Sequence, residues 1–523
     1  MATASRALSE SSWLRGLRVI ALTALAVLGG GCASLPSLEG RGETSALTDT
    51  VATRLGRAVA PLVAANPGKS GVHTLHVPTD AFAARVLLAA AAEKSLDVQY
   101  YIWHGDHTGM LLFEAVWRAA ERGVRVRILL DDANTAGLDE TIATLAAHPN
   151  IEVRLYNPFL PRGARWLNFA TDFSRVNRRM HNKSFTADNQ VAIVGGRNVG
   201  DEYFGAGDEV EFTDLDVMAI GPVVREVSAE FDLYWNSASA YPASRIVAPS
   251  GPDAAAKLEA EFASVRADPE SAAYVKALRD TQLVEELTER RLPLDWAVAR
   301  VVRDDPAKTL DTSARKDVLL LTELFAQVGP PSTSFDLVSP YFVPGDDGTA
   351  ALERLAQRGV RVRVLTNSLA ATDVAAVHAG YASRRCDLLR AGVQLYELKP
   401  TAASADISAK THGSSASLHA KTFALDRERI FVGSFNFDQR SAFLNTEMGI
   451  VIDSPALARR LSEALDNVQR QAYEVVVAAD GHCPEWIERT AQGEVRYEVE
   501  PNTDASRRAW VRFLETLPIE WLL

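Results

Sequence analysis

The sequence has little cysteine, no excess of positive charge and no apolar run as long as a bilayer-spanning helix. Three cysteines occur in 523 residues, far too few for a disulfide-dense secreted scaffold. The formal net charge of −12 argues against a general nucleic-acid-binding protein, which usually carries a basic face that neutralises phosphates. Any phosphate must therefore be bound by a local cluster of basic groups. The length allows about two to four domains.

The first 32 residues have the layout of an export signal. Three arginines precede the apolar stretch Val19–Leu28, which is well short of the ~20 residues that a bilayer requires. Three glycines and Cys32 follow, so the segment resembles a bacterial lipoprotein signal whose cysteine is lipidated after cleavage, although Gly29 replaces the usual aliphatic residue. An ordinary secretory signal and an uncleaved tether are the alternatives. Each places the folded part in the cell envelope, facing the periplasm or the exterior, and the first predicts a membrane-anchored lipoprotein.

An internal repeat organises the rest of the chain. Residues 95–98 and 334–337 open two similar strands, and each strand leads through a turn to an amphipathic helix. The helices end at Gly123 and Gly359, and each glycine is followed by Val-Arg-Val-Arg. A glycine just after a helix, with a β-branched run behind it, is typical of a helix-to-strand turn. We therefore predict an α/β fold of two pseudo-twofold-related α-β-α sandwich lobes with mixed sheets and an active site between them.

The predicted domains follow from this repeat and from composition. The interval between the two copies predicts helices over 254–266 and 272–291 and a strand over 292–302, which is typical of a structural connector. The predicted ranges are a signal peptide over 1–32, a linker over 33–75, a first lobe over 76–246, a helical connector over 247–330, a second lobe over 331–475 and a C-terminal extension over 476–523.

The pattern His-x-Lys-x-x-x-x-Asp occurs once in each repeat. Its two copies are His181/Lys183/Asp188 and His419/Lys421/Asp426, and each is followed by a Gly-x-x-Asn that ends in Asn198 or Asn436. Residues two apart in a strand share a face, so strands over Met180–Ala187 and Leu418–Leu425 would point each histidine and lysine the same way. The aspartates fall in turns, where a carboxylate accepts backbone N–H bonds, and we expect them to be structural.

These side chains suit a phosphodiester. Two imidazoles, two ammonium groups, two asparagine amides and the hydroxyl of Ser434 would surround one phosphorus atom. Lysine and asparagine can stabilise charge on the non-bridging oxygens, so we expect no metal and no other cofactor. The alternative is a degenerate repeat without activity.

The paired motifs resemble those of the phospholipase D superfamily over about residues 75–475. Within it, Gly433–Ser441 with Asn445–Glu447, Thr366–Asp373 and Pro518–Leu523 are similar to bacterial cardiolipin synthases, particularly the C type. The resemblance implies a phosphohistidine intermediate, with His181 as nucleophile and His419 as general acid, a choice that the near-symmetry leaves open. It also implies that Glu447 and Asp214 fix the histidine tautomers; Asp216 or Glu209 could replace Asp214, because the spacing after Asn198 is longer than that after Asn436.

Three further features have alternative interpretations. Arg440 could bind a lipid phosphate or form an ion pair with Asp438 or another acid. Cys386 and Cys483 could be buried thiols or a disulfide. Residues 505–517 predict a helix whose apolar face could rest in a membrane interface or dock onto the core.

The resemblance implies a phosphatidyltransferase that makes cardiolipin. Its partners would be phospholipids, namely phosphatidylglycerol and possibly phosphatidylethanolamine, together with a membrane surface, and no nucleic acid is expected. Hydrolysis to phosphatidic acid is the nearest alternative, since water and an alcohol enter at one position. A nuclease is disfavoured by the acidic composition. The non-enzymatic alternative is an envelope lipoprotein with an inert lipid-binding repeat. The oligomeric state is left open.

Overall fold

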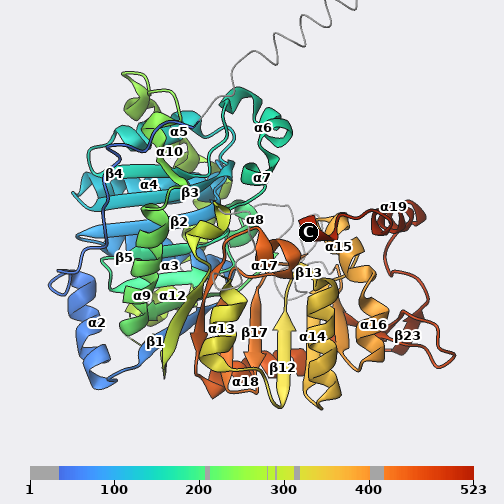
Figure 1. The fold of residues 1–523 in the computed structure, drawn as a ribbon. Helices are drawn as coiled ribbons and strands as arrows, with labels where there is room; N and C mark the ends of the chain where they lie inside the picture. The colour runs from blue at the N-terminus through green and yellow to red at the C-terminus, as the bar shows by residue number, and fades with distance from the viewer. Residues whose placement is uncertain (1–34, 207–211, 280, 289–290, 311–318, 401–416) are drawn as a thin grey trace, which may run out of the picture.

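The computed structural model describes residues 35–523 apart from 207–211, 280, 289–290, 311–318 and 401–416. Cys32 and the predicted signal therefore lie outside the described residues. Figure 1 shows two lobes side by side, each with a sheet covered by helices. None of the helices in the described ranges combines the length and apolar character of a membrane span.

The first lobe contains a nine-stranded sheet in the order β10-β1-β8-β6-β5-β2-β3-β4-β9. Its strands are β1 (Ser70–Leu75), β2 (Ser95–Ile102), β3 (Arg125–Asn134), β4 (Ile151–Tyr156), β5 (Ser184–Ala187), β6 (Val191–Gly195), β8 (Asp216–Ile220), β9 (Ala240–Pro242) and β10 (Asp295–Ala297). Its helices are α2 (Arg54–Ala65), α3 (Pro78–Ala91), α4 (His107–Glu121), α5 (Asp139–Ala147), α6 (Trp166–Thr171), α7 (Phe173–Val176), α8 (Asp201–Phe204) and α9 (Pro222–Trp235).

The second lobe contains a ten-stranded sheet in the order β11-β20-β18-β17-β12-β14-β15-β21-β22-β23. Its strands are β11 (Ala299–Arg303), β12 (Ser334–Val338), β14 (Arg361–Asn367), β15 (Gln394–Leu398), β17 (Thr422–Leu425), β18 (Arg429–Gly433), β20 (Met448–Ile452), β21 (Ala472–Val476), β22 (Glu485–Thr490) and β23 (Gly493–Tyr497). Its helices are α13 (Leu320–Val328), α14 (Gly345–Gln357), α15 (Ala375–Ala382), α16 (Arg385–Arg390), α17 (Gln439–Phe443), α18 (Pro455–Asp466) and α19 (Ala505–Glu515).

The two sheets repeat one topology. The run β1-β8-β6-β5-β2-β3-β4-β9 of the first sheet corresponds strand by strand to β11-β20-β18-β17-β12-β14-β15-β21 of the second. In each copy the strands of the repeat pair in parallel and the motif hairpin pairs antiparallel with them. This confirms the predicted α/β class with two similar lobes and mixed sheets.

The repeated sequence Val-Arg-Val-Arg has the same role in both lobes. Gly123 and Gly359 end α4 and α14 with positive φ angles of 91° and 84°, a conformation that a side chain disfavours. The second arginine of each run is buried and pairs with an aspartate on the neighbouring strand, Arg127 with Asp97 and Arg363 with Asp336, both at 2.7 Å. Each copy thus has an equivalent buried ion pair between neighbouring parallel strands.

One hydrophobic cluster joins the lobes. Small and branched side chains of β6 and β8, such as Val194 and Ala219, belong to the same buried cluster as Ile430 and Ile450 of β18 and β20. Such packing excludes water along the seam and fixes the lobes relative to each other. Any site between them is therefore rigidly held.

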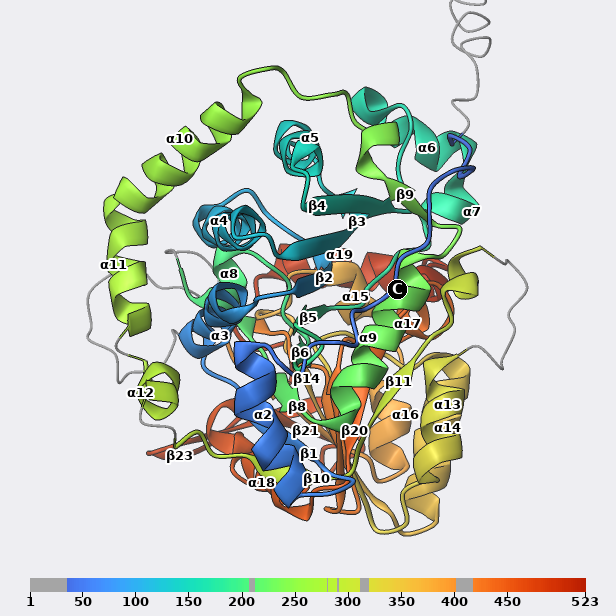
Figure 2. The ribbon, with the colours of Figure 1, turned by 90° about the vertical axis from the view of Figure 1, so that its left-hand side faces the viewer.

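The connector differs in part from its prediction. Helices α10 (Ala254–Ala267), α11 (Pro269–Arg279) and α12 (Gln282–Thr288) occupy its first half, as Figure 2 shows. The predicted strand over 292–302 is split at Val298, so that β10 adds to the edge of the first sheet and β11 to the edge of the second. The strand β1 also lies inside the range predicted as linker, because its backbone pairs with β8. The first sheet thus begins at Ser70, ahead of the predicted boundary at 76.

The two motif aspartates lie at hairpin turns. Asp188 and Asp426 have positive φ angles of 52° and 57°. The carboxylate of Asp188 accepts hydrogen bonds of 2.7–3.2 Å from the backbone N–H groups of residues 93–95, and that of Asp426 accepts bonds of 2.7–3.1 Å from residues 332–334. Each turn is thereby fastened to the start of β2 or β12. These contacts support the structural role predicted for both residues.

We expect Asp188→Ala to lower the free energy of unfolding by about 2–4 kcal/mol, because it leaves three backbone donors without their charged acceptor. Asp426→Ala should cost less, since its contacts are partly exposed. Urea unfolding monitored by circular dichroism measures both. Asp387→Ala is the control, because its carboxylate is 58% exposed. Equal stability of the Asp188 and Asp387 variants would contradict the assignment.

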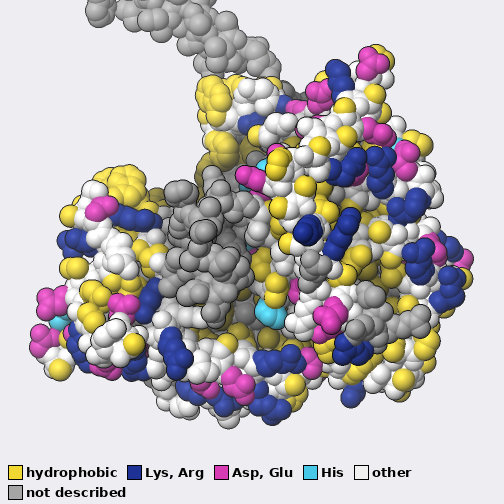
Figure 3. Space-filling view, turned by 180° about the vertical axis from the view of Figure 1, so that it is seen from behind, with side chains coloured by type: hydrophobic (Ala, Val, Ile, Leu, Met, Phe, Trp, Pro, Cys, Tyr) yellow, Lys and Arg dark blue, Asp and Glu magenta, His cyan; other side chains and the backbone are white. Residues whose placement is uncertain are grey.

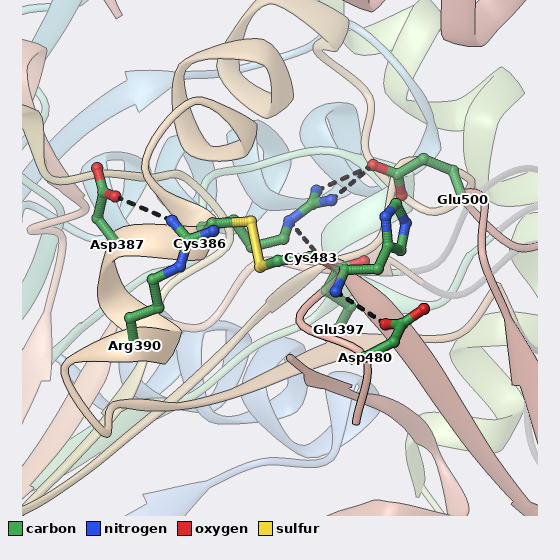
Figure 4. Close-up of a disulfide and its surroundings, with 9 residues drawn as sticks. Cys386, Asp387, Arg390, Glu397, Asp480, Cys483 and Glu500 are labelled. Carbon is green, nitrogen blue, oxygen red and sulfur yellow. Dashed lines mark hydrogen bonds and ion pairs between the residues drawn. A yellow bond between two sulfur atoms is a disulfide. The ribbon is translucent and has the colours of Figure 1, made fainter. Parts of the chain in front are cut away.

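A disulfide fastens the C-terminal extension to the second lobe. Cys386 on α16 is bonded to Cys483 in the loop between β21 and β22, with the Cα atoms 5.9 Å apart, as Figure 4 shows. Beside it, Arg385 pairs with Glu397 at 3.2 Å and with Glu500 at 2.9 Å. Of the two interpretations of these cysteines, the structure has the disulfide.

Replacing both cysteines by serine should lower the stability of the fold by about 2–4 kcal/mol, because the unfolded chain loses a cross-link that closes a long loop. Thermal unfolding with and without dithiothreitol tests this. Reductant should lower the midpoint of the wild type and leave that of the Cys386→Ser/Cys483→Ser variant unchanged. A wild type that is insensitive to complete reduction would refute it.

Candidate active site

Each motif segment pairs with the other lobe. The backbone N–H of His181 donates to the carbonyl of Thr446 at 2.9 Å, and that of His419 donates to the carbonyl of Thr213 at 2.9 Å. Next to the latter contact, β7 (Phe212–Thr213) and β16 (Ser417–Leu418) form a two-stranded parallel sheet across the lobes. The strands predicted over 180–187 and 418–425 therefore begin later than predicted, at Ser184 and Thr422, because the backbone before them is bonded to the opposite lobe.

Each motif histidine also pairs through its side chain with a carboxylate of the other lobe. His181 Nδ1 lies 2.8 Å from Glu447 Oε2, and these residues are 266 positions apart. His419 Nδ1 lies 2.6 Å from Asp214 Oδ2, across 205 positions. Both imidazoles are 7% exposed. A carboxylate that binds Nδ1–H leaves Nε2 as the reactive nitrogen, which is the arrangement that an acid–base or nucleophilic histidine needs.

The two lysines lie beside the histidines. Lys183 Nζ donates to the carbonyl of His181 at 2.5 Å. Lys421 Nζ donates to the carbonyl of His419 and lies 2.9 Å from its Nδ1. The predicted proximity of histidine and lysine is thus present in both copies, although neither pair lies within a strand.

The electrostatics of the four basic groups show that they share one region. Burial, followed by Lys183, Lys421 and His419, lowers the pKa of His181 well below its usual value. Burial and Lys421 lower the pKa of His419 to about 4.

Both ammonium groups are perturbed in the same direction. Burial lowers the pKa of Lys421 to about 8, and burial together with Lys421 lowers that of Lys183 well below its usual value. A bound anion would oppose all four shifts, because it offsets both the lost hydration and the mutual repulsion. The site therefore favours an anionic ligand such as a phosphodiester.

Glu447 is held by a network of buried donors. Its carboxylate accepts hydrogen bonds from Ser434 Oγ at 2.5 Å and from Ser441 Oγ at 2.8 Å, and its backbone N–H donates to Asp304 at 2.8 Å. Burial raises the pKa of Glu447 to about 7 in spite of Lys183 and the two hydroxyls. The hydroxyl of Ser434 was predicted to contact substrate, but it donates to the carboxylate of Glu447 and orients that group instead.

The sequence offers three acids for the carboxylate of the first repeat that orients a histidine. Asp214 is the one that reaches His419. Asp216 pairs with Arg85 at 2.8 Å and is fully buried there, and Glu209 lies outside the described residues. The longer spacing after Asn198 contains α8. Although burial opposes it, His419 and Lys421 lower the pKa of Asp214 below its usual range.

The hydrogen bonds found for Asn198 and Arg440 go to residues other than the motif histidines and lysines. Asn198 accepts from the backbone N–H of Ile102 at 3.2 Å and donates to the hydroxyl of Tyr203 at 3.0 Å. Asn436 is 4% exposed, and its Oδ1 has no hydrogen-bond partner within the described part of the chain. Arg440 donates to the carbonyl of Asn177 at 2.9 Å and to its side chain, so it links the lobes rather than pairing with Asp438.

Several supporting residues were assigned no role in the site from the sequence, among them Tyr101, which as an aromatic residue at a strand end was expected to belong to the core. The rings of Tyr101 and Tyr203 lie edge-on to His181 and His419, at 4.9 and 5.1 Å between centroids. Tyr203 follows Asn198 at the same spacing at which Ser441 follows Asn436, and this repeat could have identified both. Asp304 belongs to the connector, and no pattern in the sequence marks it.

The two half-sites are not equivalent. Asn182, between His181 and Lys183, donates to Glu230 of α9 at 2.6 Å and accepts from Thr446 Oγ1 at 3.0 Å. The corresponding residue of the second motif is Ala420, whose side chain can form no such bonds. The first motif is therefore anchored at its central residue by polar side chains. In the second motif the polar anchor lies one residue before His419, where the side chain of Asn367 bonds to the backbone N–H and the carbonyl of Leu418, both at 3.0 Å.

Known proteins share this chain's repeat. Residues 87–235 and 324–469, more than half of the chain, match the family model described as "Cardiolipin synthase, PLD-like domain". The chain is 48% identical to cardiolipin synthase C of Escherichia coli (strain K12), over 90% of this chain and 100% of that protein. It is 27% identical to cardiolipin synthase A of Pseudomonas putida (strain GB-1), over 74% of this chain and 66% of that protein.

A solved structure has the same fold at low identity. The phosphatidylserine synthase of Haemophilus influenzae aligns with a TM-score of 0.52 and 13% identity, over 77% of this chain and 87% of that one. The resemblance predicted from the paired motifs is confirmed. The chain belongs to the phospholipase D superfamily and, within it, to the cardiolipin synthase family, whose PLD-like domain it carries twice.

Proposed function

We propose that the protein is a cardiolipin synthase that transfers a phosphatidyl group from one glycerophospholipid to the glycerol headgroup of phosphatidylglycerol. The observation that carries this proposal is the pair of crossed histidine–carboxylate dyads, in which two reactive nitrogens flank a region with two buried lysines. The donor is phosphatidylglycerol or phosphatidylethanolamine.

In the first step, His181 Nε2 attacks phosphorus. Its lowered pKa keeps the imidazole neutral, and Nδ1–H donates to Glu447, which stabilises the positive charge that develops on the ring. The bond between phosphorus and the headgroup oxygen breaks, and that oxygen takes a proton from His419 Nε2. The anionic substrate and Asp214 favour the protonated form of His419 beforehand. Lys183 and Lys421 neutralise charge on the non-bridging oxygens.

In the second step, His419 takes the proton of the incoming hydroxyl, whose oxygen attacks the phosphohistidine. The phosphorus–nitrogen bond breaks, and His181 returns to its neutral form. If water replaces the alcohol, the product is phosphatidic acid. The buried Oδ1 of Asn436, which has no hydrogen-bond partner among the described residues, would be free to accept from a hydroxyl group of the substrate.

The disulfide supports a location outside the cytoplasm, where such bonds persist. Together with the lipoprotein-like signal, it favours a mature protein that is anchored at Cys32 and faces the periplasm or the exterior. The tether would hold the site at high effective concentration next to phospholipid. Mass spectrometry of the mature N-terminus tests the anchor directly.

Full-length protein incubated with labelled phosphatidylglycerol, alone and with phosphatidylethanolamine, should form cardiolipin, as resolved by lipid chromatography. His181→Ala and His419→Ala should each reduce the rate by about 10³-fold or more, because each removes one of two required groups. Leu233→Ala, on the exposed face of α9, is the control. Phosphatidic acid as the sole product would establish hydrolysis, and unchanged rates in both histidine variants would place the chemistry elsewhere.

The pH dependence of kcat, measured with saturating phospholipid so that the bound anion keeps His419 protonated, should be bell-shaped. The rate should rise with pH through about 7 as Glu447 ionises and can accept Nδ1–H, and fall above about 8 as Lys421 loses its proton. Glu447→Gln should remove the acidic limb and lower the rate by about 10²–10⁴-fold. Glu463→Gln, exposed on α18, should leave the profile unchanged. An acidic limb that survives in Glu447→Gln would assign it to another group.

A further inference from the structure

Large apolar side chains are exposed in two groups, one on each lobe. The first-lobe patch consists of Trp166, Phe169 and Phe173 on α6 and α7, which are 70%, 50% and 41% exposed. The second-lobe patch consists of Trp510, Phe513, Leu517 and Trp521 on and after α19, which are 53%, 51%, 37% and 56% exposed. Single exposed apolar residues are ordinary, but aromatic groups of this size mark an interaction surface.

The second-lobe patch is not the docking face of its helix. Val511 and Leu514 of α19 are buried against Leu369 and Ala379, so the helix is already packed on the lobe. Trp510 and Phe513 point away from this contact and stack on each other with centroids 5.5 Å apart. The helix thus combines both arrangements that its sequence allowed, a docked face and an apolar face turned to solvent.

The first-lobe patch is held in place by polar contacts. Arg162 before α6 bonds to Asp132 at 2.7 Å, and Arg175 of α7 bonds to Asn157 at 2.7 Å. These bonds fix the two short helices to the first lobe. Phe169 also contacts the buried ring of Phe159, with centroids 5.7 Å apart, and remains half exposed. The exposure of the aromatic residues is a stable feature of the surface.

Both patches are connected to the active site. Asn177, directly after α7, accepts from Arg440 of α17, and α17 carries Ser441, which bonds to Glu447. On the other side, Arg507 of α19 donates to the carbonyl of Thr372, next to Asp373, which bonds to Tyr341. Each patch is therefore linked through a short series of contacts to residues around the interlobe site, the first through Ser441 to Glu447 and the second to Asp373, whose charge raises the pKa of Lys421.

The patches lie on one side of the molecule. Figure 3 shows hydrophobic side chains over the upper parts of both lobes, where Figure 1 places α6–α7 and α19. Figures 1 and 2 agree that the described chain starts beside α6. The residues that precede it contain the apolar stretch Val19–Leu28. A tether that leaves at this point would bring this side of the molecule toward a membrane.

We propose that the two patches form one lipid-facing rim, which inserts its aromatic side chains into the interface of a phospholipid bilayer and directs the interlobe site toward it. The claim that the active site faces the bilayer rests on the proposed function, whereas the claim that the rim binds the bilayer does not. With a net charge of −12 the protein gains little from attraction to anionic lipid. Tryptophan and phenylalanine at the headgroup boundary supply affinity without charge.

Tryptophan fluorescence tests the rim without any need for catalysis. Full-length Trp13→Phe protein would be reconstituted with vesicles of phosphatidylethanolamine and phosphatidylglycerol, with or without brominated acyl chains, which quench nearby indoles. The further change Trp166→Phe/Trp510→Phe/Trp521→Phe should abolish most of the quenching, and Trp166→Phe alone should abolish part of it. The control Trp103→Phe/Trp235→Phe/Trp486→Phe, in which each residue is at most 3% exposed, should abolish none. Quenching that survives the first triple change, or that is confined to one lobe, overturns the proposal.

A second variant separates surface binding from chemistry. Phe169→Asp/Phe513→Asp should reduce turnover several-fold on vesicles and leave it unchanged with phospholipid dispersed in detergent. Leu62→Asp/Val495→Asp changes residues of 46% and 41% exposure elsewhere and should affect neither. Equal losses in vesicles and detergent would contradict the rim. A wild type without turnover would defeat the proposed function and leave the fluorescence result as the test of the rim.

Discussion

The exchange of hydrogen bonds between the lobes is the constraint on which the rest of the site depends. Each lobe supplies a histidine to the carboxylate of the other, and backbone bonds from His181 to Thr446 and from His419 to Thr213 hold the two dyads in register. Neither half-site is complete alone, because one lobe has the imidazole and the other has the group that orients it. The apolar seam between β6, β8, β18 and β20 keeps the lobes in position. It thereby preserves both histidine–carboxylate pairs, since a shift of the lobes would break them at once.

Because these charged groups are buried close together, the site is electrostatically unfavourable when no anionic ligand is bound. Two lysines and two histidines are buried around two carboxylates, and the pKa values of all four bases are lowered by burial and mutual repulsion. A phosphodiester restores part of the lost solvation and attracts the protons needed for its own cleavage. In the proposed mechanism the protonation of His419 would be coupled to substrate binding, so the general acid would form only where it is used.

The repeat and the reactive groups could be predicted from the sequence, because both depend on patterns of residues that are close together in the chain. The two motifs predicted histidine next to lysine, and the glycine turns at Gly123 and Gly359 predicted the shared topology. The crossing of the dyads could not be predicted, since it joins residues 266 and 205 positions apart. For the same reason Ser434 and Arg440 were expected to face substrate, whereas their partners Glu447 and Asn177 lie on segments whose approach is decided by lobe packing.

The two copies have diverged enough to suggest unequal roles. Asn182 ties the centre of the first motif to Glu230 and Thr446, whereas Ala420 at the same position of the second motif has no polar side chain, and the polar anchor there is Asn367, which bonds to Leu418. Glu447 has a pKa of about 7, while His419 and Lys421 keep Asp214 ionised. A permanently ionised partner favours a histidine that must carry a proton, and a rigidly held neutral imidazole favours attack on phosphorus. This asymmetry supports His181 as the nucleophile and His419 as the acid, an assignment that the duplicated motif alone leaves open.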